Sequence, residues 1–437
     1  MATLFPIPDN HPQRFILHNE VHARSSLILD LPVKASHLAL LLAADEKILE
    51  RKHLAALCER FGITPPKRDV DHFNAAFDPF QIRWEQHGEF STYTFYVQDN
   101  SEDPFAQPAL EKVPVDWLAM LPGKVMVAAH AAIMAKPDQE GKKADPHPDL
   151  HALSGFFDGN PIIGSEVMGG AAFAFTDFRI HVDGFSRFLI IDNHLKTEQA
   201  GRLLQRLFEI EVYRMMALLA FPIARRLTPA LKKADRQLYT ITNVMAQPDS
   251  NDAELLDELT RLAAEIENHI SSSHFRFDAA NAYYQIVEQR LDDLREVRIQ
   301  GIQTLGEFIR RRMEPAIKTC QSTAHRFTLI SERVSNAGHL LRTRVDIMIE
   351  RQNQALLTSM DLRAKMQLRM QETVEGISVV AITYYSAGLV GIIAKALNAA
   401  GWPIDPELAV GLSLPFIMVA VALGIRRIHK LIKTTTT

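Results

Sequence analysis

Residues 376–425 read GISVVAITYYSAGLVGIIAKALNAAGWPIDPELAVGLSLPFIMVAVALGI and contain two uncharged apolar runs, Gly376–Ala394 and Leu408–Ile425. Each run has 18 or 19 residues, which is enough to cross a hydrocarbon core of about 30 Å at about 1.5 Å per helical residue. The link between them contains the only charges of the region, so it predicts a turn between two spanning helices. We therefore expect residues 374–433 to form a transmembrane hairpin.

Basic residues flank this hairpin at its outer ends: Arg363, Lys365 and Arg369 precede the first run, and Arg426, Arg427, Lys430 and Lys433 follow the second. The link has one lysine against Asp405 and Glu407. Because basic flanks remain on the cytoplasmic side of a membrane, we expect a multi-pass protein of the inner (cytoplasmic) membrane with both termini in the cytoplasm.

The charge and cysteine content narrow the class of partner. The chain has 437 residues and a formal net charge of −4. Because nucleic acid binding usually requires a basic surface, nucleic acid is not expected to be the main partner. Cys58 and Cys320 lie far apart in helical patterns and predict buried thiols rather than a disulfide framework. The N-terminal residues lack the basic and apolar regions of a secretory signal, so the part ahead of the hairpin is expected to begin in the cytoplasm.

Residues 1–195 predict a cytoplasmic α+β domain, which we call the head. An apolar run, His37–Ala43, precedes a helical pattern at Ala44–Phe61. Alternating side chains predict a β-hairpin formed by Gln81–Gln86 and Phe90–Val97. Further strands are expected at Lys124–Met134, Pro161–Met168, Ala171–Val182 and Ser186–Asp192. We expect a mostly antiparallel sheet of about five or six strands, with no strands in the rest of the chain.

Residues 196–250 predict helices that link this domain to a stalk. The first is expected over Glu198–Ala224, with Pro222 kinking or ending it, and the second over roughly Pro229–Met245. Four polar residues interrupt the apolar pattern of the first helix, and we interpret them as an internal charge network that fixes the helix to the sheet: Glu209, Glu211, Tyr213 and Arg214.

Residues 251–373 predict a long coiled-coil stalk. Helices are expected from a capping box at Asn251 and Glu254, over Ala279–Arg312, and from about Ala316 directly into the first span. Positions spaced by four and three residues form a diluted apolar seam along the last helix: Leu341, Val345, Met348, Gln352, Ala355, Ser359, Leu362 and Met366. Such a helix has to pack on the preceding helices, on copies of itself, or on both.

Several alternating polar sets are candidates for chemistry. His18, Glu20, His22 and Arg24 would share one face of a strand, which is compatible with a metal site, a catalytic patch or a polar sheet face. Asp145, His147, Asp149 and His151 alternate in a Pro-rich loop that suits either a divalent ion or solvent. Two further sets predict outward strand faces opposite the core: Arg83, Glu85, His87 and Glu89, and Asp177, Arg179, His181 and Asp183.

Motifs that bind phosphates, dinucleotides or zinc are absent from the sequence, as is the nucleophile elbow of hydrolases. No catalytic residue and no cofactor is therefore predicted. In the first span, Ala381, Tyr385, Gly388 and Gly391, with Lys395 beyond them, present a small face. Small residues allow helices to approach closely in lipid, and the same face would suit the lining of a pore.

Motifs along the whole chain resemble a bacterial family of membrane-anchored proteins that contain a domain of unknown function. The resemblance rests on His11-Pro-Gln-Arg14, Asn19-Glu-Val-His-Ala-Arg24, Glu89-Phe-Ser-Thr-Tyr-Thr-Phe95, Thr176-Asp-Phe-Arg179, Glu211-Val-Tyr-Arg-Met-Met216 and Thr373-Val-Glu-Gly-Ile-Ser-Val379. Ser25 departs from the pattern, where a proline is expected. The resemblance implies a membrane anchor and a polar motif in the head, formed by Arg14, Asn19, Glu20, His22 and Arg24, but no activity.

The order of the predicted parts also resembles the CorA-type magnesium channels, which are homo-pentamers lined by their first spans. Their Gly-Met-Asn motif is absent, and Gly388–Lys395 stands in its place. Three hypotheses follow: a homo-oligomeric scaffold or sensor whose head binds a protein or small ligand, a CorA-like channel or transporter without that motif, and a membrane-bound enzyme using His18, Glu20 and His22. The sequence leaves the ligand, the ion, the partner and the subunit number open.

Overall fold

The computed structural model describes residues 8–15, 17–18, 27–67, 70–135, 148–248, 250–403 and 405–434. The chain divides into two compact units. The first comprises residues 1–250 and 257–337, and the second comprises residues 251–256 and 338–437. The first unit contains the sheet and most of the helices, and the second contains the two apolar runs.

The described part of the first unit is built on a mixed nine-stranded sheet in the order β2-β3-β4-β1-β5-β8-β7-β6-β9. All neighbouring strands are antiparallel except β5 and β8. The strands are β1 (Val33–Leu41), β2 (His72–Phe77), β3 (Phe80–Gln86), β4 (Phe90–Gln98), β5 (Lys124–Ala135), β6 (Ile163–Val167), β7 (Ala172–Thr176), β8 (Ser186–Asp192) and β9 (Val297–Arg298).

Side-chain alternation along β1, β3 and β4 separates two faces of the sheet. Helix α2 (Ala44–Arg60) covers one face, where Leu54 and Leu57 pack into a core with Trp84 and Phe95. Glu50 of α2 is buried there and accepts hydrogen bonds from Trp84 Nε1, Gln86 Nε2 and Ser91 Oγ at 3.1, 2.9 and 2.8 Å. The α2 face is therefore a closed core with an internal polar anchor.

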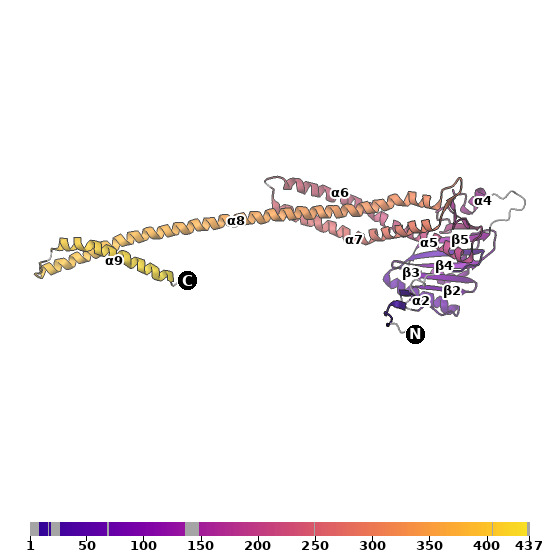
Figure 1. Cartoon of the computed structure of the whole chain (residues 1–437), viewed down its shortest axis with the longest axis horizontal. Coiled ribbons are helices and arrows are strands. Elements are labelled where there is room, and N and C mark those ends of the chain that lie inside the picture. The colour runs from indigo at the N-terminus through magenta and orange to yellow at the C-terminus, as the bar shows by residue number, and fades with distance from the viewer. Residues whose placement is uncertain are drawn as a thin grey trace. The chain divides into compact units, whose positions relative to one another are not determined.

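Helix α5 (Thr197–Leu218) covers the opposite face (Figure 1). Val212 and Met216 pack against Ala39, Phe90 and Val127 of the sheet. Short helices η1 (Ala109–Lys112), α3 (Val115–Ala119), α4 (Leu150–Ser154) and η2 (Gly155–Phe157) complete the head. Phe157 belongs to a second core with residues of β5, β7 and β8.

The predicted α+β class is confirmed, and the hairpin of β3 and β4 and the strands β5 and β8 lie where the pattern placed them. The predicted strand Ala171–Val182 is wrong in its second half, because β7 ends at Thr176 and a turn follows. The sheet is also larger than expected. Strand β2 was not predicted, β1 had been recognised only as an apolar run, and β9 lies inside a stretch predicted to be helical.

Three helix boundaries differ from expectation. Helix α5 ends at Leu218 and α6 (Ala220–Met245) begins before Pro222, because proline fits the first turn of a helix, where its missing N–H has no partner to lose. Helix α7 (Asp252–Asp293) runs unbroken through the serines at 271–273, and Ser273 Oγ donates to His269 O at 2.6 Å.

The third difference is at the start of α8 (Leu305–Ala399), which begins before Pro315 and includes it. Glu296, just after α7 ends, accepts hydrogen bonds from the backbone N–H groups of Leu305 and Gly306, both at 2.9 Å. This carboxylate satisfies two N–H groups that lack partners at a helix start, which explains why a new helix begins here.

Within the first unit, α6, α7 and α8 lie side by side (Figure 1). Lys233 of α6 pairs with Glu265 of α7 at 2.9 Å, and Asp235 of α6 pairs with Arg333 of α8 at 3.1 Å. The predicted stripe on α7 is buried at Leu259, Leu262 and Ile266. These side chains form the interior of a helical bundle within one chain.

In the second unit, the C-terminal part of α8 packs against α9 (Pro406–Thr434). Thr383, Ala387 and Ala394 are buried on one stripe of α8. A Cβ atom added at Gly391 would lie 3.1 Å from Val410 Cγ2 of α9. Small residues thus permit the close approach of these two helices.

Candidate functional site

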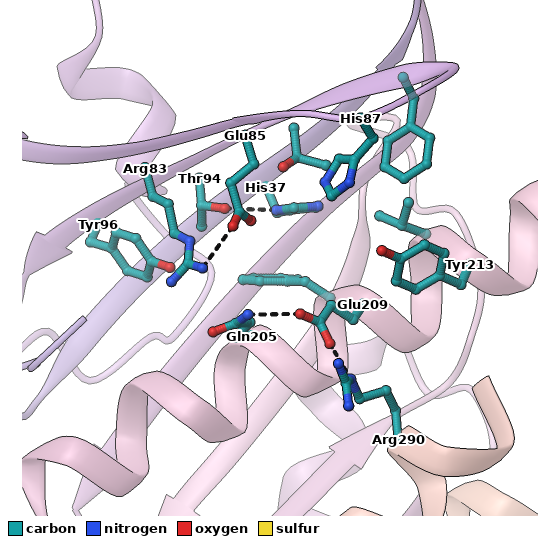
Figure 2. A pocket seen from close by; sticks show the side chains of 14 residues that line it. His37, Arg83, Glu85, His87, Thr94, Tyr96, Gln205, Glu209, Tyr213 and Arg290 are labelled. Atoms are coloured by element: carbon teal, nitrogen blue, oxygen red, sulfur yellow. Dashed lines mark hydrogen bonds and ion pairs between the residues drawn. The ribbon is translucent and has the colours of Figure 1, made fainter. Parts of the chain in front are cut away.

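A cavity of about 240 Å³ lies between α5 and the sheet strands β1, β3 and β4 (Figure 2). Both walls belong to the first unit. The residues that line it are His37, Arg83, Glu85, His87, Phe90, Thr92, Thr94, Tyr96, Gln205, Phe208, Glu209, Val212, Tyr213 and Arg290. We treat this cavity, which we call the α5 cavity, as the candidate functional site.

The sheet wall follows from strand register. Thr94 of β4 lies opposite Arg83 of β3 and opposite His37 of β1, and Glu85 lies opposite Thr92. Because cross-strand neighbours point to the same side of a sheet, these residues share the face toward α5. Their alternation partners pack into the core under α2, where the side chains are apolar.

The helix wall follows from a spacing of three and four residues on α5, which places Gln205, Phe208, Glu209, Val212 and Tyr213 on one stripe. This stripe faces the polar side of the sheet rather than an apolar one. The cavity therefore lies where polar side chains of α5 face polar side chains of the sheet.

Two ion pairs lie on opposite walls. Arg83 Nη2 donates to Glu85 Oε1 at 2.8 Å on the sheet, and the two side chains are 5% and 15% exposed. On the helix, Glu209 Oε1 accepts from Gln205 Nε2 at 2.7 Å, while Oε2 accepts from Arg290 Nε of α7 (Figure 2). The two acidic side chains thus each have a cationic neighbour and still face the cavity.

His37 is the most unusual group of the site. Its Nδ1 lies 2.8 Å from Thr94 Oγ1, and its ring stacks on Phe208 with centroids 4.5 Å apart. Its Nε2 is buried and has no hydrogen-bond partner within the described part of the chain. Burial, with smaller contributions from Arg83 and His87, lowers the pKa of His37 to about 3, so the imidazole is neutral at physiological pH.

Two tyrosines at the cavity are held as neutral phenols. Burial raises the pKa of Tyr96 to about 12, with Arg83 opposing and Glu85 adding to the shift. Burial also raises the pKa of Tyr213 well above its ordinary value, and Glu209 and Glu85 raise it further. Both acidic residues therefore act on the Tyr213 hydroxyl.

Residues Arg83, Glu85 and His87, predicted to form an outward face, instead line the α5 cavity. Glu89 of the same set pairs with Arg276 of α7 at 2.7 Å. The prediction that the polar set on α5 fixes this helix to the sheet is also corrected. Glu209 accepts a hydrogen bond from Arg290 of α7 rather than from the sheet. Glu211 pairs with Arg214 within the helix at 2.6 Å.

The set around His181 is also not an outward strand face. Asp177 and His181 are buried after the end of β7, and His181 Nδ1 lies 2.8 Å from Asp158 Oδ2. Arg187 pairs with Asp183 at 3.5 Å. These contacts hold a turn together.

The predicted polar motif of the head lies largely outside the described residues, because Asn19, Glu20, His22 and Arg24 are not described. Residues 14, 15, 17 and 18 are helical, with Leu17 N donating to Gln13 O at 2.9 Å. The strand considered for His18, Glu20, His22 and Arg24 is therefore wrong at His18. Arg14 Nη1 donates to Asn10 Oδ1.

The loop predicted as a possible ion site lies partly outside the described residues, at Asp145 and His147. Asp149 caps α4 by accepting hydrogen bonds from the backbone of His151 and Ala152. Across the described ranges, no three His, Cys, Asp or Glu side chains are grouped so that they could hold a metal ion.

Two helices of the second unit are long and apolar enough to cross a membrane: α8, through its C-terminal part, and α9. Of the predicted small face, Gly391 packs toward α9, whereas Ala381, Tyr385, Gly388 and Lys395 are exposed. The exposed residues lie on a different side of α8 from the stripe that contacts α9.

The fold and cavity define an α+β protein with a cavity lined by polar and aromatic side chains and two helices of membrane-spanning length. The chain belongs to the family described as "Protein of unknown function (DUF3422)", which it matches over residues 9–432. No curated protein and no solved structure matches the chain.

Proposed function

We propose that this protein is a membrane-anchored sensor of the bacterial inner membrane, held by the hairpin of α8 and α9, with a cytoplasmic head that binds a small ligand in the α5 cavity. The observation that carries the anchor is the exposure of large apolar side chains on both helices, including Ile377, Leu389, Leu412 and Phe416 at 65, 61, 68 and 76%. Contiguous apolar surface of this kind is costly in water and is favourable in lipid.

Charge supports the orientation of the hairpin. Arg363, Lys365 and Arg369 precede the first apolar run and Arg426 and Arg427 follow the second. With these residues on the cytoplasmic side, the link at residues 395–407 lies outside and the head lies inside. The head is then exposed to cytoplasmic metabolites, which suits a sensor.

The pore hypothesis lacks a comparable supporting observation. Exposure of Ala381, Tyr385 and Gly388 in a single chain fits contact with lipid or with another copy as well as a pore. The enzyme hypothesis rested on His18, Glu20 and His22, of which Glu20 and His22 lie outside the described residues. A binding site therefore explains the described geometry best.

The anchor is tested by alkaline carbonate extraction of bacterial membranes. We expect the protein to stay in the membrane pellet, and Phe416→Arg to release a substantial fraction, because a central arginine costs about 2.5–3.5 kcal/mol in membrane insertion. Asn398→Arg, at an exposed position near the end of α8 and beyond the first apolar run, is the matched control and should remain in the pellet. Complete release of the wild-type protein would contradict the anchor.

A further inference from the structure

The α5 cavity has acidic side chains on both walls. Glu85 projects from β3 and Glu209 from α5, and Figure 2 shows them on the sheet side and the helix side respectively. A carboxylate has roughly four lone-pair sites, and Glu85 and Glu209 use one and two of them in the contacts described above. Both retain capacity to accept hydrogen bonds from a ligand.

His37 is an independent observation that indicates a ligand. The residue is 5% exposed and lines the cavity, and Nε2 is buried without a partner in the described part of the chain. Nδ1 lies within hydrogen-bond distance of Thr94 Oγ1. We assign the proton of the neutral ring to Nδ1, as the donor to this hydroxyl, which makes Nε2 a hydrogen-bond acceptor. Buried polar atoms are almost always paired in folded proteins, so a donor from a bound molecule would complete this site.

The cationic side chains of the cavity are already engaged. Arg83 is bound by Glu85, and Arg290 is bound by Glu209 and by Asp293. An anionic ligand at these arginines would also lie against the carboxylates of Glu85 and Glu209, which repel it. A ligand with positively charged N–H donors is attracted to both carboxylates, so the charges of the cavity favour a donor.

Aromatic groups surround the same space. Phe208 and Tyr213 come from α5, and Phe90 and Tyr96 come from β4. Aromatic faces attract organic cations, and a protonated amine has three N–H donors. Those three donors match three acceptors: the carboxylates of Glu85 and Glu209 and Nε2 of His37.

We propose that the α5 cavity binds a small molecule through a protonated primary amine, which lies between Glu85 and Glu209 and donates to His37 Nε2. The inference rests on the proposed binding role of the head and names its ligand class. A cavity of about 240 Å³ is below the usual range for drug-sized ligands and suits a free diamine or amino acid.

The test is isothermal titration calorimetry on the purified full-length chain in detergent at pH 7. The probes are 1,4-diaminobutane, L-lysine and the uncharged analogue 1,4-butanediol. We expect one or both amines to bind and the diol not to bind. Glu85→Gln and Glu209→Gln are each expected to weaken binding by roughly tenfold or more. Glu111→Gln is the matched control, because Glu111 is exposed on η1, which contacts Ser36 on the α2 side of the sheet.

The two amines distinguish the sources of the ligand. Tighter binding of L-lysine indicates an amino acid whose carboxylate adds a contact, and tighter binding of the diamine indicates a polyamine. Equal binding of the diol, or amine affinities unchanged in both glutamate variants, would overturn the inference. The comparison of amines with the diol uses only wild-type protein, so it decides the question even where a variant fails to fold.

A second measurement separates the ligand class from the binding role. Small molecules released by denaturing the purified wild-type protein are identified by mass spectrometry and compared with those released from Glu209→Gln. Release of a non-amine from the wild type alone would overturn the amine proposal and leave the binding role intact. Absence of any released molecule, with no binding of either amine, would reject both, while the membrane anchor is decided separately by extraction.

Discussion

At the scale of the residue, His37 links the stability of the head to pH. Burial lowers its pKa from 6.5 to about 3. Between these values the unfolded chain binds a proton that the folded head does not, so the free energy of unfolding falls as the pH drops through this window. For one group the slope is at most about 1.4 kcal/mol per pH unit. His130, whose pKa burial lowers to about 4, acts in the same direction.

We therefore expect His37→Asn to flatten the loss of stability between pH 6.5 and pH 4, leaving the part due to His130. The measurement is denaturant unfolding at several pH values, followed by the fluorescence of the buried Trp84 and Trp117. His151→Asn, at an exposed position, should keep the wild-type slope. A slope in His37→Asn as steep as in the wild type would contradict this account.

At the scale of the element, Glu50 fixes α2 to the sheet. Its carboxylate accepts three hydrogen bonds from buried or partly buried donors of β3 and β4. Glu50→Ala leaves those donors without an acceptor, and each unsatisfied buried donor costs about 1–3 kcal/mol. We expect a loss of about 3 kcal/mol or more in the free energy of unfolding, measured by denaturant titration.

The comparison for this prediction is Glu59→Ala, an exposed glutamate on the same helix, which should change stability by no more than about 0.5 kcal/mol. Glu50→Gln retains one carbonyl acceptor and should fall between the two. If Glu50→Ala were as stable as Glu59→Ala, the carboxylate would not be what attaches α2 to the sheet.

The helices and strands differ in how well they could be predicted from the sequence. Local sequence patterns predicted α2, the hairpin of β3 and β4, and β5, because the apolar spacing at Leu54 and Leu57 and the alternation along the strands are contained in neighbouring residues. The boundaries of α7 and α8 were missed because they depend on contacts that a local pattern does not contain, such as the hydrogen bonds from Leu305 and Gly306 to Glu296.

The α5 cavity was missed for a related reason. The alternation of Arg83, Glu85 and His87 showed correctly that they share a face, and the polar residues on α5 were recognised as a group. A polar strand face usually points to solvent, so nothing local indicated that α5 would cover it. The sequence feature that could have revealed the cavity was the presence of both a polar strand face and a polar helix stripe in one domain.

At the scale of the whole molecule, the exposed apolar residues of α8 ahead of the first span are the remaining feature to explain. Met348, Leu362 and Met366 of the predicted seam are 53, 54 and 62% exposed in the single chain, although Leu341 is buried. Apolar side chains at coiled-coil spacing are stabilised by a second helix with the same pattern. We infer that copies of this chain associate through the seam.

We expect light scattering in detergent, with the detergent contribution subtracted, to give a mass at least twice the 49.2 kDa of one chain. Met348→Lys combined with Leu362→Lys should lower that mass, because charges at seam positions oppose close helix packing. Asn353→Lys, which lies off the seam, should leave it unchanged. A closed ring of about five copies, the number suggested by the CorA resemblance, would justify ion-flux measurements with Gly388→Leu. A monomer would contradict self-association, and two spans in one chain cannot enclose a pore.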